Sequence, residues 1–129
     1  MAYQNYNPNP ARSRVGDCTV RALSKALRLD WDGAFAALVA EAFQQKDMPS
    51  SDSVWNAVLR NEGFHRRGLP DTCPECYTVR QFAAEHPEGI FVVATPKHVL
   101  AVEDGDFFDT WDSGDETPLY YYEKKKKGV

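Results

Sequence analysis

The chain has 129 residues, of which 43% are hydrophobic and 26% charged, a composition typical of one globular domain. The formal net charge is −4, and four of the fifteen basic residues form one run, Lys124 to Lys127, which leaves eleven basic residues against nineteen acidic ones. So acidic a body excludes nucleic acid as the main partner, because phosphate binding needs a basic face.

Membrane and export segments are not expected. The longest apolar stretch is far shorter than a bilayer span, and the polar, proline-punctuated start differs from a secretory signal. The three cysteines, Cys18, Cys73 and Cys76, are an odd number, which favours free thiols in a reducing compartment. We therefore expect no membrane partner and a cytoplasmic location.

The first predicted elements are an arm and a helix. Asn-Pro dipeptides favour turns and extended backbone, so residues 1–16 are expected to be an irregular extended arm. Asp17 is a potential N-cap, and apolar residues follow at helical spacing, which predicts a helix beginning at Cys18. Its basic residues are expected on the stripe opposite the apolar one; they are Arg21, Lys25 and Arg28.

Three more helices are predicted from caps and apolar spacing. Asp30 is expected to cap a helix over about 31–46, and Ser51 one over about 52–62 that Gly63 ends. Thr78 is expected to cap a short helix that stops at His86-Pro87, because a proline disfavours helical backbone before it.

From Gly89 onward the pattern changes to strands. Residues 90–95 and 99–102 are apolar runs, and Asp104-Gly105 is a hairpin turn signal leading to Phe107 and Phe108. Residues 119–122 complete the sheet, with the tyrosines expected to alternate across an edge strand. The layout predicts an α+β fold, N-terminal helices on a C-terminal antiparallel sheet, in one domain over 1–123 with a solvated basic tail over 124–129.

Gly16-Asp17-Cys18 is the strongest candidate for chemistry. A thiol in the first helical turn lies near the positive end of the helix dipole and near unpaired N–H groups, which lowers its pKa. Gly16 leaves space for a substrate. The alternative is a structural thiol, since free cysteine is among the most buried residue types.

A second feature lies in the strands. His98 precedes an apolar strand, and after the hairpin the chain reads Asp109-Thr110-Trp111. The returning strand can bring Asp109 to His98 and Trp111 over the contact as a shield from water. A thiolate, a histidine base and an orienting acid are the components of cysteine nucleophilic catalysis. Asp112 is the reserve for the third position.

These three motifs, in this order, resemble the papain-like cysteine peptidase superfamily. The separation of 80 residues between Cys18 and His98 is most similar to compact bacterial versions such as the bacteriocin-processing peptidase domains. The sequence also resembles small bacterial and phage proteins that share Gly-Asp-Cys and Asp-Thr-Trp-Asp-Ser-Gly. The resemblance implies a papain-like fold with Cys18 at the start of the central helix and His98 on the sheet.

One departure concerns the oxyanion hole. The superfamily usually has a Gln a few residues before the nucleophile, whereas residues 11–15 here contain none. The nearby amides are Gln4, Asn5, Asn7 and Asn9, and Asn9 is the expected donor beside the Cys18 N–H. Loss of one oxyanion donor typically costs about 10²–10³ in rate.

Cys73-Pro74-Glu75-Cys76 is the third feature. The spacing suits two thiolates on one metal, but zinc needs four ligands and no second pair of cysteines exists. Zinc binding and redox work are weaker interpretations than plain loop thiols, so no metal is predicted.

The leading hypothesis is a papain-like thiol hydrolase that cleaves a peptide or isopeptide-type amide in a peptide or protein substrate, with Cys18, His98 and Asp109 and no cofactor. Another thiol amidase would use the same triad. The alternative from a different class is a catalytically degenerate interaction protein that binds a protein partner through the same groove. The oligomeric state stays open.

Overall fold

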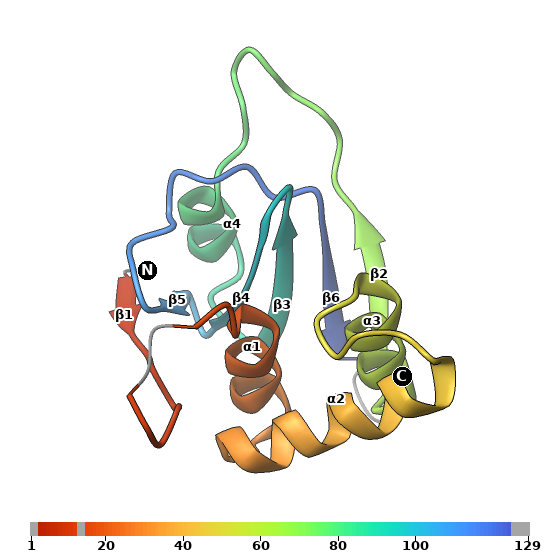
Figure 1. The fold of residues 1–129 in the computed structure, drawn as a ribbon. Helices are drawn as coiled ribbons and strands as arrows, with labels where there is room; N and C mark the ends of the chain where they lie inside the picture. Colours follow the sequence, from red (N-terminus) through yellow and green to blue (C-terminus); the bar gives the residue numbers. More distant parts are fainter. Residues whose placement is uncertain (1–2, 13–14, 125–129) are drawn as a thin grey trace.

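The computed structural model describes residues 3–12 and 15–124, which fold into an α+β arrangement as expected (Figure 1). In chain order the elements are β1 (Tyr3–Asn5), α1 (Cys18–Leu27), α2 (Trp31–Gln45), α3 (Asp52–Asn61), β2 (Phe64–Gly68), α4 (Val79–Glu85), β3 (Ile90–Thr95), β4 (His98–Glu103), β5 (Asp106–Asp109) and β6 (Tyr120–Lys124). Among the described residues, no helix is long and apolar enough to cross a bilayer.

The strands form one mixed sheet in the order β1-β5-β4-β3-β6-β2. β1 pairs with β5 in parallel, with Asn5 opposite Asp109, and the other neighbours are antiparallel. Two predictions are therefore wrong: the arm is not irregular over Tyr3–Asn5, and the sheet is not wholly antiparallel. The pairing partner of β1 lies about a hundred residues away, so local sequence gives no sign of this strand.

The predicted helices are confirmed, but their caps differ. The Asp30 carboxylate accepts the Gly33 N–H at 2.8 Å, and Thr78 forms a capping box with Gln81. Asp17 and Ser51 occupy N-cap positions without a side-chain cap bond. The carboxylate of Asp17 has other partners, described below.

The sheet lies between two layers of helices. On one face α1, α2 and α3 pack against a cluster that includes Trp55, Phe64 and Tyr122. On the other face α4 packs its Phe82 against a second cluster with Tyr121 at its margin. The tyrosines of β6 thus alternate between the two cores, as expected, but β6 lies inside the sheet, between β3 and β2, and not at its edge.

The connection between β2 and α4 projects from the rest of the molecule (Figure 1). It carries Cys73 and Cys76, which are joined to each other as a disulfide. The expectation of free thiols is therefore wrong for these two, and as a disulfide they offer no thiolate to a metal. Cys18 is the remaining cysteine and is free. The predicted basic tail begins one residue too early, because Lys124 ends β6, and residues 125–129 lie outside the described part.

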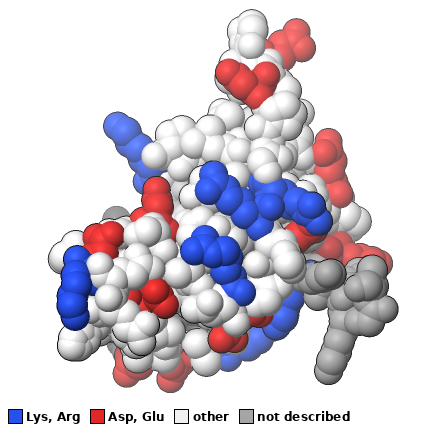
Figure 2. Space-filling model, turned by 90° about the vertical axis from the view of Figure 1, so that its right-hand side faces the viewer, with Lys and Arg blue, Asp and Glu red and all other residues white. Residues whose placement is uncertain are grey.

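Acidic and basic side chains are interspersed over the face in Figure 2, with basic ones gathered at its centre. Arg60 of α3 and Arg66 of β2 line one shallow hollow. Arg66 lies over the Tyr120 ring at 3.9 Å, and its neighbour Arg67 pairs with Glu123 at 2.5 Å. Arg66 and Arg67 are thus already engaged within the protein.

Leu59 and Leu119 offer a matched test of the packing. Leu59 is fully buried in α3, whereas Leu119 is about half exposed. We expect Leu59→Ala to lower the free energy of unfolding by about 2–5 kcal/mol, because it leaves a cavity in the core. Leu119→Ala, the control, should change it by less than about 1 kcal/mol. Urea unfolding followed by circular dichroism measures both, and equal losses would contradict the core assignment.

Candidate active site

Three separate elements bring Cys18, His98 and Asp109 together. Cys18 is the first residue of α1, His98 the first of β4, and Asp109 the last of β5. β4 and β5 form an antiparallel hairpin through the Asp104-Gly105 turn, so the start of one strand lies near the end of the other. The start of α1 lies against the same end of β4, which places the thiol next to the imidazole.

His98 links the other two groups. Its Nε2 lies 2.5 Å from the Asp109 carboxylate, and it also shares a hydrogen bond with the Cys18 thiol. Because Nε2 is occupied by Asp109, Nδ1 is the ring nitrogen left for Cys18. Burial alone would lower the pKa of His98, but the hydrogen bonds to Asp109 and Cys18 outweigh it and raise the pKa to about 9.

The raised pKa of His98 makes the stability of the fold depend on pH. His98 binds its proton more tightly in the folded protein than in the unfolded chain, whose histidines titrate near 6.5. Its contribution to stability is therefore fully present below pH 6.5 and is lost as the pH rises through about 9.

The thiol of Cys18 has the complementary shift. Burial acts to raise its pKa, but the hydrogen bonds from His98 and from the Val99 backbone N–H, with the charges of His98 and Arg21, lower the pKa overall. A lowered thiol pKa beside a raised imidazole pKa favours the thiolate–imidazolium pair near neutral pH. This is the charge state of an activated nucleophile.

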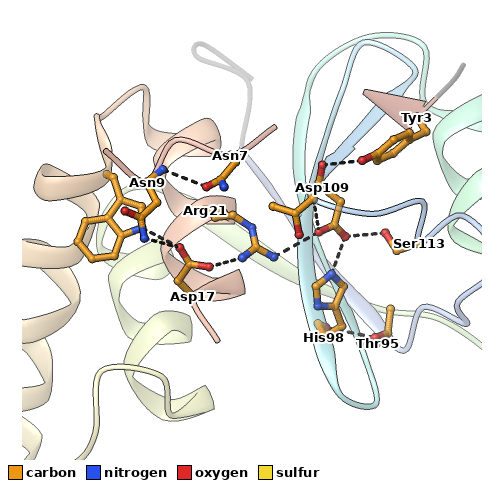
Figure 3. A network of polar contacts seen from close by, with 11 residues as sticks. Tyr3, Asn7, Asn9, Asp17, Arg21, Thr95, His98, Asp109 and Ser113 are labelled. Atoms are coloured by element: carbon orange, nitrogen blue, oxygen red, sulfur yellow. Dashed lines mark hydrogen bonds and ion pairs between the residues drawn. The ribbon is translucent and has the colours of Figure 1, made fainter. Parts of the chain in front are cut away.

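Asp109 is held in place from several sides (Figure 3). Its carboxylate accepts hydrogen bonds from the Ser113 hydroxyl at 2.6 Å and from the Thr110 N–H at 2.8 Å. Its backbone carbonyl accepts from the Tyr6 N–H at 2.8 Å and from the Tyr3 hydroxyl at 3.2 Å. Burial alone would raise the pKa of Asp109, but the bonds from His98 and Ser113 lower it, so the group stays ionised.

Arg21 connects the start of α1 to Asp109 and was expected on the exposed stripe. Instead it is 8% exposed; its guanidinium pairs with Asp17 in the same helix and lies 3.3 Å from Asp109. Asp17 also accepts from the Trp31 Nε1–H at 2.9 Å. The spacing of four residues between Asp17 and Arg21 signals a helical ion pair, but nothing in the sequence signals the contact with Asp109.

The catalytic candidates lie between two hollows. A cavity of about 470 Å³ is lined by Asn5, Asn7, Gly16, Cys18, His98 and Trp111, among others. A second one of about 290 Å³, lined by Trp55, Leu119 and Tyr120 among others, also reaches Cys18 and His98. A Cβ on Gly16 would meet nothing within 4 Å, which agrees with open space beside the thiol. The two hollows can accommodate a chain on both sides of the thiol.

Of the other predicted site residues, Trp111 lies beside His98, whereas Asp112 and Asn9 do not take their predicted places. The Trp111 ring lies 5.3 Å from the His98 ring, between centroids, and covers one side of it while remaining 46% exposed. Asp112 is not brought to His98 but lies 3.3 Å from Arg80. Asn9 is buried away from the cavity lining, with its Nδ2 3.5 Å from Asp17 and its Oδ1 accepting the Ala11 N–H.

Across residues 3–12 and 15–124, no group of three or more His, Cys, Asp or Glu is arranged to hold a metal.

Comparison with protein-family models, with curated proteins and with solved structures finds no match for this chain.

The lowered pKa of Cys18 should show in its reactivity. Limiting iodoacetamide should alkylate Cys18 at lower pH values than an ordinary thiol, because the thiolate is the reactive form. His98→Ala should slow the reaction near neutral pH and move its midpoint upward. Peptide mass mapping across pH measures this, with His65→Ala, on exposed strand β2, as the matched control. A Cys18 that reacts like an unperturbed thiol in the wild type would refute the ion pair.

The buried ion pairs of Arg21 can be tested by substitution. Arg21→Met leaves the buried Asp17 and Asp109 without their shared cation, which should lower the free energy of unfolding by about 3–5 kcal/mol. It should also raise the pKa of Cys18, since the charge of Arg21 helps to lower it. Denaturant unfolding and alkylation across pH give the two readouts, and Arg60→Met, on the surface, is the control. Wild-type values in both would show that the contact has no energetic role.

Proposed function

We propose that the chain is a papain-like thiol hydrolase that cleaves a peptide or isopeptide-type amide bond. The observation that carries the proposal is the hydrogen-bonded series Cys18, His98 and Asp109 at the edge of an open cavity. Cys18 begins a helix. The pKa of its thiol is lowered and the pKa of the His98 imidazole is raised, as a nucleophile and its base require.

In the proposed reaction, the Cys18 thiolate attacks the carbonyl carbon of the amide and forms a tetrahedral intermediate. The imidazolium of His98 gives its proton to the leaving nitrogen as the C–N bond breaks, which leaves a thioester on Cys18. His98, now neutral, takes a proton from water, whose oxygen attacks the thioester. The acid leaves, and the thiolate–imidazolium pair is restored. Asp109 orients the ring through Nε2 and stabilises its charge.

The oxyanion is assigned to donors at the cavity wall. The Cys18 N–H lies at the positive end of α1. Of the amides in the arm, Asn7 lines the cavity, and its Oδ1 accepts the Asn9 N–H at 3.2 Å, which leaves its Nδ2 as a donor. Asn9, by contrast, has its amide beside Asp17. We therefore propose Asn7 as the side-chain donor in place of Asn9.

The proposed mechanism needs no cofactor, since thiol, imidazole and carboxylate supply the nucleophile, the proton transfers and the orientation. It needs a reduced Cys18, and that cysteine is free. The hollows on both sides of the thiol suit an extended peptide or protein segment as substrate.

A second candidate is a protein that binds a partner through the same groove without cleaving it. The absence of a Gln in the stretch before Cys18 favours it, because that residue usually completes the oxyanion hole in the resembling superfamily. This candidate predicts stable capture of a partner by the wild-type chain, whereas the hydrolase predicts turnover.

The proposal is tested with a proteome-derived peptide library in which new termini are identified by mass spectrometry. We expect the wild type to cleave, Cys18→Ala to lose cleavage, and His98→Ala to fall by about 10²–10⁴ because the general base is gone. The matched control is His65→Ala, on exposed strand β2, which should retain wild-type rates. Full cleavage by Cys18→Ala would overturn the hydrolase.

A further inference from the structure

The outer face of α2 carries an apolar stripe that no described element covers. Its core-facing residues Ala34, Leu38 and Ala42 are buried, but Phe35, Val39 and Phe43 are 39%, 40% and 66% exposed. They follow one another every four residues, so they form a single row along the helix. Figure 1 shows α2 along the lower edge of the molecule, below α1 and α3.

The ends of this row carry opposite charges. Asp32 lies in the first turn of α2, and Lys46 follows its last residue. The ammonium of Lys46 lies 4.3 Å above the Phe43 ring, which places it on the same face as the row. Among the described residues, neither side chain has an ion-pair partner within this chain. With about 100° per residue, Asp32 falls between Phe35 and Phe43 around the helix, and so also belongs to this face.

The face is complementary to itself. Val39 lies midway between Phe35 and Phe43 and also midway between Asp32 and Lys46. Two copies of α2 in antiparallel contact, with a two-fold axis at Val39, therefore set each Phe35 against the Phe43 of the other copy. They also set each Asp32 against the other Lys46. Ala36, which is exposed and lies about 60° from Val39 around the helix, adds little bulk beside the contact.

From this symmetry we infer that the occupant of the α2 face is a second copy of the chain, bound in an antiparallel helix pair. A two-fold interface of this kind uses the same patch on both partners, as the pattern requires. Its two ion pairs counter the repulsion expected between two bodies of net charge −4. The inference is independent of the proposed hydrolase activity.

A charge exchange tests the inference. Sedimentation equilibrium of the full chain from about 5 to about 300 µM should show a concentration-dependent dimer. Asp32→Lys and Lys46→Asp should each weaken it by about tenfold or more, because each sets like charges against each other at both ends. The double variant that carries both changes should regain most of the wild-type affinity, since the pairs are restored with reversed sign.

Val39→Lys is a second test variant. It places one ammonium group from each copy at the two-fold axis, and their repulsion should leave only monomer. Val39 is exposed, so the fold should be kept, and circular dichroism and the rate of Cys18 alkylation are checked against the wild type. Glu62→Lys, exposed at the end of α3, is the control with an equal or larger charge change elsewhere. A wild type that is monomeric throughout the range overturns the inference. So does a dimer that is insensitive to Val39→Lys, or a double variant no tighter than the singles.

Discussion

The arrangement of the site depends on one buried cation between two buried carboxylates. Arg21 contacts Asp17 at the start of its own helix and Asp109 at the end of β5, and so fixes the helix that carries the thiol relative to the hairpin that carries the imidazole. Ionised carboxylates are costly to bury without a partner, so the two acids and the arginine constrain one another. Trp31 also donates to Asp17 and Ser113 to Asp109, which ties α2 and the loop after β5 to the same centre.

Much of this molecule can be predicted from local sequence. Helix spacing, the Asp104-Gly105 turn and the caps at Asp30 and Thr78 are local signals, and the structure agrees with each. The meeting of His98 with Asp109 follows from the hairpin, because register alone brings the two strand ends together. Local signals fail to predict the structure where partners distant in the chain determine it. Asp17 looks like a cap but binds Arg21 and Trp31, and Tyr3–Asn5 becomes a strand only because β5 is available.

The arm contacts the site in two places, at β5 and at the start of α1. Its first part adds a strand beside β5 and donates to the backbone carbonyl of Asp109 through Tyr3 and Tyr6. Its second part turns toward α1, where Asn7 lines the cavity and Asn9 bonds to Asp17. The cavity lining thus combines residues that precede the thiol in the chain with residues far beyond it, such as His98 and Trp111.

The position of β6 inside the sheet has a consequence for biosynthesis. It follows every other described element in the chain, yet it lies between β3 and β2 and presents Tyr122 to one core and Tyr121 to the other. Until β6 leaves the ribosome, β2 has no strand to pair with, and neither helical layer can complete its core. The thiol, the imidazole and the carboxylate are all synthesised earlier, but the scaffold that aligns them is completed last. A nascent chain is therefore expected to lack the aligned arrangement of these three groups until β6 has left the ribosome.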